Sequence, residues 1–121
     1  MVKTLFDTNI LIDYLKGVRQ AKAELALYED SAISIITWME VQVGIEPDEQ
    51  AKVDNFLRQF AILPVDAQVS LQAVALRKKK NIKLPDAIIW ATAKVSNRLL
   101  VTRNGKDFPA SHPGVRIPYV L

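Results

Sequence analysis

The chain has 121 residues, half of them apolar, and its 16 Lys and Arg against 13 Asp and Glu give a formal net charge of +3. The absence of cysteine excludes disulfides, thiol catalysis and thiolate zinc sites, and the single histidine, His112, lies in a turn-like tail where we expect it to be exposed. No apolar run approaches the roughly 18 residues that span a bilayer, and the first residues lack a signal-peptide core. We therefore expect one cytoplasmic domain, residues 1–121, without membrane contact.

Segments that favour strands alternate with segments that favour helices along the whole chain. Strands are expected at residues 3–6, 31–36, 61–65, 99–101 and 115–120, the last at a sheet edge because of Pro118. Helices are expected at residues 10–15, 20–28, 37–44, 47–59, 67–80 and 85–95. This alternation predicts βαβ units, and hence a three-layer α/β/α sandwich with a mainly parallel central sheet.

Charge is distributed unevenly. Residues 1–76 hold 6 Lys and Arg against 11 Asp and Glu, whereas residues 77–106 hold 9 against one, Asp86. A positive field over one side of a small domain attracts a polyanion, and nucleic acid is the usual candidate. The basic run at 77–80 also has a plainer explanation, because cations are favourable at the end of a helix.

Three acids follow or flank the expected strands at equivalent places. Asp7 follows the first strand, Glu40 lies in the first turn after the second, and Asp86 begins the apolar helix. Each also has a structural explanation: Asp7 as a turn or cap, Glu40 as the end of a Thr37-x-x-Glu40 capping box, and Asp86 as a charge favoured by the helix dipole. Because the ends of parallel strands meet at one edge, we expect the three carboxylates to converge, and mutual repulsion then requires a cation.

Hard oxygen ligands without His or Cys favour Mg²⁺ or Mn²⁺, which bind substrate phosphates together with few carboxylates. Such ions activate a water for attack on a phosphodiester and stabilise the developing charge. The cations expected to hold flanking phosphates are Arg103, Lys79, Lys80 and Lys83.

At this point the chain resembles a known family. The runs Phe6-Asp7-Thr8-Asn9, Ile36-Thr37-Trp38-Met39-Glu40, Leu84-Pro85-Asp86-Ala87 and Val101-Thr102-Arg103-Asn104 with Asp107-Phe108 are similar, in order and spacing, to a PIN domain of the VapC toxin type. The resemblance implies a Mg²⁺- or Mn²⁺-dependent endoribonuclease that forms a homodimer and is inhibited by a VapB-like antitoxin. It also implies that Asp7, Glu40 and Asp86 are the family's first three acids.

The fourth acid of the family falls on Asn104, which brings an amide oxygen but no charge. Asp107 is the available replacement, although a turn role before Phe108 explains it equally well. The resemblance further implies that Thr8, Asn9 and Thr102 position the ligands or water.

Two other functions stay open. A PIN-like module that binds RNA or a partner without cutting is compatible with the loss of charge at Asn104. A phosphoacceptor receiver domain would use Asp66 after the third strand, but it calls for an acidic pair after the first strand and a Lys-Pro step that this chain lacks. Asp13 and Asp66 are more simply explained by a helix face and a helix cap.

Overall fold

The computed structural model describes residues 1–121 and has five strands and six α-helices. The strands are β1 (Lys3–Phe6), β2 (Asp30–Ser34), β3 (Ala61–Leu63), β4 (Leu99–Val101) and β5 (Val115–Arg116). The helices are α1 (Thr8–Leu15), α2 (Arg19–Ala26), α3 (Ile35–Val43), α4 (Gln50–Leu57), α5 (Ala67–Lys80) and α6 (Leu84–Val95), with a 3₁₀ turn η1 (Pro47–Glu49) before α4. No helix is both long and apolar enough to cross a bilayer.

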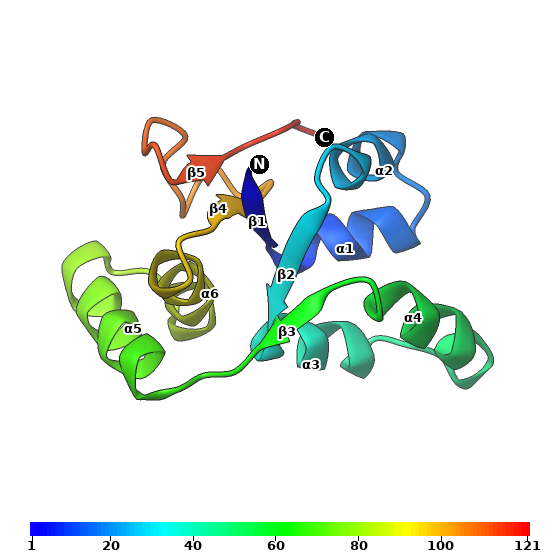
Figure 1. The fold of residues 1–121 in the computed structure, drawn as a ribbon, viewed down its shortest axis with the longest axis horizontal. Helices are drawn as coiled ribbons and strands as arrows, with labels where there is room; N and C mark the ends of the chain where they lie inside the picture. Colours follow the sequence, from blue (N-terminus) through cyan, green and yellow to red (C-terminus); the bar gives the residue numbers. More distant parts are fainter.

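The strands form one sheet in the order β3-β2-β1-β4-β5, and every neighbouring pair is parallel. Helices cover both faces, with α5 and α6 on one side and α1 to α4 on the other (Figure 1). The predicted α/β/α architecture is therefore confirmed.

Alternate residues of each central strand pack into the two hydrophobic cores, one on each face of the sheet. Leu5 of β1 and Leu100 of β4 are fully buried and pack with α5 and α6, including Trp90, and with Phe108 of the loop after β4. The next residue in each strand, Phe6 or Val101, packs on the opposite face with α1, α2 and α4. The alternation is what a strand buried on both faces requires, since successive side chains point to opposite sides.

The chain order places the end of β1 beside the end of β4. From β1 the chain builds outward through β2 to β3, then returns across the sheet to add β4 on the other side of β1. The direction in which strands are added therefore reverses between β1 and β4. This position is the topological switch point, where open parallel sheets bind their ligands. Asp7 follows β1 and Thr102 follows β4, so the fold brings these two residues together there.

Several expected boundaries were wrong by a few residues, and one error matters for function. β2 ends at Ser34, and Ile35 and Ile36 belong to α3 rather than to the strand. Ser34 caps that helix, because its Oγ accepts a hydrogen bond from the Ile36 N–H at 3.1 Å. Thr37 is inside the helix, so the capping-box explanation of Glu40 is wrong. Glu40 lies in the second turn of α3, not the first.

Two smaller expectations were also wrong. The last strand is two residues long, at the edge predicted for it, and does not extend to residue 120. His112 is half-buried rather than exposed, with its ring edge-on to Trp90 at 5.4 Å between centroids. Its Nδ1 accepts a hydrogen bond from the Gly114 N–H, so it holds the turn that leads into β5.

Candidate active site

Asp7 is the most deeply buried acid at the carboxyl ends of the central strands, with 4% of its surface exposed. Its Oδ1 accepts a hydrogen bond from the Thr8 N–H at 2.7 Å, and its Oδ2 accepts one from the Thr102 hydroxyl at 2.7 Å. Burial raises the pKa of Asp7 to about 6; the hydrogen bonds from Thr102 and Thr8 oppose the rise, and the charges of Asp86 and Glu40 add to it. All the groups that stabilise the ionised carboxylate are therefore neutral.

Glu40 is held toward Asp7 by a threonine pair. The Thr8 hydroxyl donates to Glu40 Oε1 at 2.7 Å and shares a second hydrogen bond, at 2.9 Å, with the fully buried Thr37 hydroxyl. Because Thr8 begins α1 and Thr37 lies in α3, these bonds join two helices that start beside adjacent strands. Thr8, predicted to position ligands, contacts two of the predicted acids: its N–H binds Asp7 and its hydroxyl binds Glu40.

Asp86 lies in the first turn of α6, where Pro85 occupies one of the first two positions. The orphan N–H groups and the positive end of the helix dipole favour an anion there. Even so, burial raises the pKa of Asp86 above its ordinary value, the charges of Asp107 and Glu40 raise it further, and Lys83 lowers it. Asp86 therefore lies within electrostatic reach of two other carboxylates.

Asn104 and Asp107 form one hydrogen-bonded unit in the loop after β4. Asn104 Nδ2 donates to Asp107 Oδ2 at 2.9 Å, and Asn104 Oδ1 accepts from the Asp107 N–H at 3.2 Å. The Asn104 N–H donates to the Thr102 hydroxyl, which ties this unit to Asp7. The amide thus orients the Asp107 carboxylate, whose charge acts on Asp86.

The acids face one another but do not close around a point. No group of three or more His, Cys, Asp or Glu side chains in the structure is arranged so that it could hold one metal ion. Asp7, Glu40 and Asp86 are therefore close enough for their charges to interact, as expected. Their side chains are not arranged as a three-acid cage around one ion. Mg²⁺ does not require such a cage, because it is held by one or two carboxylates and keeps several waters.

Asn9 links the same strand ends from the other side. Its Nδ2 donates to the Thr102 hydroxyl at 3.3 Å, and its Oδ1 accepts from the Arg103 N–H at 3.1 Å. Asn9 and Thr102, both predicted to be positioning residues, therefore hold the loop that carries Asn104 and Asp107.

Arg103 has a partner that the sequence analysis did not anticipate. Its Nε and one terminal nitrogen donate to the two oxygens of Asp13, at 2.6 and 3.0 Å, and the Tyr119 hydroxyl donates to the same carboxylate at 2.8 Å. Asp13 lies on α1, as expected, but it is buried and paired, so a helix face alone does not explain it. No local pattern signals this contact, since 90 residues separate the two partners. The guanidinium predicted to bind RNA is thus already engaged.

The predicted lysines stand apart from this pair. Lys79, Lys80 and Lys83 are exposed, at the end of α5 and in the turn before α6. Lys83 is close enough to Asp86 to lower its pKa. Asp66, the acceptor required by a receiver domain, caps α5 through a hydrogen bond from the Val69 N–H at 2.9 Å.

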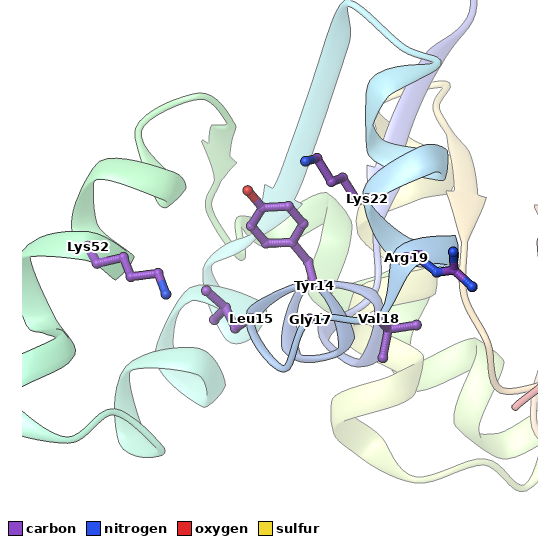
Figure 2. A pocket seen from close by; sticks show the side chains of 7 residues that line it. All are labelled: Tyr14, Leu15, Gly17, Val18, Arg19, Lys22 and Lys52. Atoms are coloured by element: carbon purple, nitrogen blue, oxygen red, sulfur yellow. The ribbon is translucent and has the colours of Figure 1, made fainter.

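A separate concavity of about 380 Å³ lies between the end of α1, the start of α2 and α4. Tyr14, Leu15 and Lys22 line it, and Figure 2 shows Lys52 reaching toward it from α4. Smaller hollows that share Leu15 adjoin it, and one of them is lined by Glu40 as well as by Ile12 and Ile45. A groove lined by both apolar and charged side chains therefore extends from Glu40 across α1.

Comparison with known proteins identifies the family. The PIN domain family model matches residues 4–110. The chain is also 34% identical over 112 residues, 88% of this chain and 79% of the relative, to Ribonuclease VapC1 of Methanocaldococcus jannaschii. The chain belongs to the PIN domain family, among the VapC ribonucleases. Ribonuclease VapC10 of Mycobacterium tuberculosis is 30% identical over 113 residues, covering 87% of this chain and 85% of the relative.

Solved structures of PIN domains agree with the assignment. A chain in a toxin–antitoxin complex from Klebsiella pneumoniae superposes with a TM-score of 0.92 at 46% identity, over 98% of this chain and 100% of that one. A chain of the DNA-bound VapBC complex from Salmonella typhimurium superposes with a TM-score of 0.81 at 26% identity, over 96% of each chain. The resemblance read from the sequence is confirmed, and the receiver-domain alternative is wrong.

Proposed function

We propose that this PIN domain is an endoribonuclease toxin that cleaves RNA phosphodiesters with Mg²⁺ or Mn²⁺ at Asp7, Glu40 and Asp86, bound directly by one or two of these carboxylates and by the others through its waters. The observation that carries the proposal is the placement of a carboxylate that is 4% exposed at the end of β1, with Glu40 tied to the same helix start through Thr8. The charges of Asp86 and Glu40 both raise the pKa of Asp7, which agrees with this placement. No cation of the chain contacts Asp7, so a cation from solution is the means of relieving the repulsion. The absence of Cys, and the contacts of the single histidine, His112, with Trp90 and Gly114, favour a hard, oxygen-binding ion.

When bound, a divalent ion supplies the activation of a water molecule and stabilises negative charge on phosphorus. The chain's own residues supply the arrangement. Thr8 and Thr102 orient Glu40 and Asp7 through hydrogen bonds of 2.7 Å, without adding positive charge that would compete with the ion. Asn9 holds the 102–107 loop against β1, so that the acids on separate elements keep their relative positions.

The test compares Asp86→Asn with Asp48→Asn, which changes an exposed acid in η1, far from the strand ends in sequence. Purified protein is incubated with total cellular RNA and Mg²⁺, and the products are resolved on denaturing gels. We expect Asp86→Asn to lose cleavage by at least about 100-fold while retaining the folded circular-dichroism spectrum, and Asp48→Asn to cut normally. Equal cleavage by both variants would refute the site, and no cleavage by the wild type would favour the non-cutting RNA-binding alternative.

We further propose that Asp107, rather than Asn104, supplies the fourth acid. The support is the Asn104 Nδ2 to Asp107 Oδ2 bond at 2.9 Å together with the effect of Asp107 on the pKa of Asp86. Asp107→Asn removes the charge and is expected to lower kcat about tenfold or more. Asn104→Ala removes only the hydrogen bonds that orient the Asp107 carboxylate, so it should lower kcat less. Full activity in Asp107→Asn would mean that three acids suffice.

A VapB-like antitoxin is the proposed protein partner, and the groove across α1 is its proposed docking place. The groove adjoins Glu40 and is floored by Ile12, Leu15 and Ile45, so a bound segment would reach the acids. Leu15→Asp should abolish inhibition by the co-expressed antitoxin while RNA cleavage by the isolated toxin persists. Retained inhibition would move the docking place elsewhere.

The homodimer stays a prediction. Exposed apolar side chains on α3, Met39 and Val43, and on α5, Leu71 and Val74, offer surface that a second copy would cover. Sedimentation equilibrium of the purified chain tests it directly, and a monomer at micromolar concentration would contradict it.

A further inference from the structure

Exposed lysines that form no ion pair lie along one flank of α6. The ion pairs of the structure are Lys52–Glu49, Arg98–Asp30, Arg103–Asp13 and Arg116–Glu24. Lys80, Lys83 and Lys94 take part in none of them, and all three are exposed. Free lysines on one flank are the electrostatic footprint of a polyanion site.

Two of these lysines converge on one buried ring. The Lys80 Nζ lies 5.7 Å and the Lys94 Nζ 5.2 Å from the centre of Trp90, which is 1% exposed. The His112 ring meets the same indole edge-on at 5.4 Å. Lys80 comes from the end of α5, Lys94 from the last turn of α6, and His112 from the loop before β5. Separate elements therefore bring three nitrogen-bearing side chains around one ring, which fixes their positions better than a run of lysines on one helix would.

No acid offsets this cluster. Burial lowers the pKa of His112, and the charges of Lys94 and Lys80 lower it further, without an opposing carboxylate. The two ammonium groups are thus close enough to the imidazole to repel its protonation. The field of these two ammonium groups at the imidazole is therefore positive.

The lysine cluster and the predicted acid Asp86 lie on the same helix, α6. Asp86 is in the first turn of α6, Trp90 follows one turn later and Lys94 two turns later, so the strip extends about 12 Å from the carboxylate along the helix. The loop after β4 follows the same flank, since Asp107 acts on Asp86 and the Phe108 ring lies 5.6 Å from Trp90. Lys83 is the N-cap of α6, three residues before Asp86, so it flanks this carboxylate on the side away from Trp90 and Lys94.

We propose that the α6 strip, defined as Lys80, Lys83, Lys94 and His112, binds the phosphates of the RNA strand on one side of the cleaved bond. This inference rests on the proposed nuclease function. RNA is favoured over an acidic protein segment because the strip is continuous with the acids proposed to act on a phosphodiester. A cluster of carboxylates repels a polyanion, so cations beside it are needed to bring the strand into reach. The Trp90 ring is covered, so it supports the cations and does not stack on a base.

The test measures binding of a fluorescent, mixed-sequence, 20-nucleotide single-stranded RNA by anisotropy, with the full-length chain carrying Asp86→Asn to prevent cutting. In that chain Lys80→Gln with Lys94→Gln is compared with Lys22→Gln, which removes an exposed cation of α2 that lies outside the strip. We expect about tenfold weaker binding in the double variant. The slope of log K against log salt should also be smaller by about 1.4, because each phosphate that a lysine no longer neutralises reduces it by about 0.7. Lys80→Arg with Lys94→Arg should restore both.

Equal RNA binding by the double variant and the Lys22→Gln control would overturn the proposal. Normal RNA binding combined with loss of affinity for a co-expressed antitoxin would also overturn it, in favour of a protein partner. With Asp86 intact, the double variant should raise the KM for this RNA and leave kcat unchanged. Loss of binding in the double variant, when even the wild-type chain cuts no RNA, would support the strip and count against the nuclease instead, so the two failures are distinguishable.

Discussion

Asp7→Asn removes the charge whose burial is most costly, and it should stabilise the metal-free protein at neutral pH while abolishing cleavage. The pKa of Asp7 is raised from 3.8 to about 6, mainly by burial. At 1.36 kcal/mol per pKa unit, ionising this carboxyl in the fold costs about 3 kcal/mol more than in the unfolded chain. The side chain is 4% exposed, so solvent screens little of that cost.

Because the pKa of Asp7 is raised in the fold, its contribution to stability decreases as the pH rises. A carboxyl with a raised folded pKa contributes stability that is fully present below pH 3.8 and is lost as the pH rises through about 6. Between pH 4.5 and 7.5 the loss is about 2 kcal/mol for this group. Asparagine lacks the titration, and its amide oxygen can still accept from the Thr8 N–H.

Urea unfolding of the wild type and Asp7→Asn in EDTA, at pH 4.5 and at pH 7.5, isolates the effect. The difference between the two proteins cancels other titrating groups, so Asp7→Asn should gain about 2 kcal/mol relative to the wild type on going to the higher pH. A difference that does not change between the two pH values would refute the claim that Asp7 is a buried, poorly compensated charge. Loss of stability in Asp7→Asn at pH 7.5 only would mean that the ionised carboxylate supports the fold.

Three further outcomes follow from the same contacts. Thr102→Val removes the 2.7 Å hydrogen bond to Asp7, so the pKa of Asp7 should rise further and the acid limb of the cleavage pH profile should move to higher pH, as initial rates from pH 5 to 8 would show. Mg²⁺ should raise the melting temperature of the wild type at pH 7.5 and leave that of Asp7→Asn nearly unchanged, and equal shifts in calorimetry would place the ion elsewhere. Arg103→Met leaves the buried Asp13 charge without its ion-pair partner and should cost about 3 to 5 kcal/mol in urea unfolding, whereas a loss below about 1 kcal/mol would show the pair to be dispensable.

The positions of Asp7 and Asp86 were predictable because each follows a pattern with a local cause. A β-branched or apolar strand ends at Phe6, and Pro85 begins a helix, so the adjoining carboxylates had to lie at element ends. The parallel topology then brings the carboxyl ends of the strands to one edge of the sheet, independently of loop conformation. Thr102, beyond the short apolar strand β4, was predictable for the same reason.

Glu40 shows where local pattern fails. Both Ser34 and Thr37 satisfy the chemistry of a helix cap, and the β-branched pair between them favours continuation of the strand. The choice is made by tertiary contact: burying Thr37 against the Thr8 hydroxyl requires α3 to begin two residues earlier than expected. A predicted cap is thus a side chain that joins two helices, and Glu40 is turned toward Thr8 instead of its own backbone.

The contact between Arg103 and Asp13 was missed for a different reason, and this contact bears on the mechanism. The guanidinium is one residue from Thr102, near enough in sequence to neutralise Asp7, yet Asp13 and Tyr119 hold it on the other side of the loop. Thr8, Asn9 and Thr102, all neutral donors, are left to contact the buried carboxylate. If Arg103 paired with Asp7, the acids would be compensated within the chain and would have little need of a metal ion. The Asp13 ion pair therefore keeps a cation of the chain away from the acids, which preserves the unbalanced negative charge that the proposed divalent ion would bind.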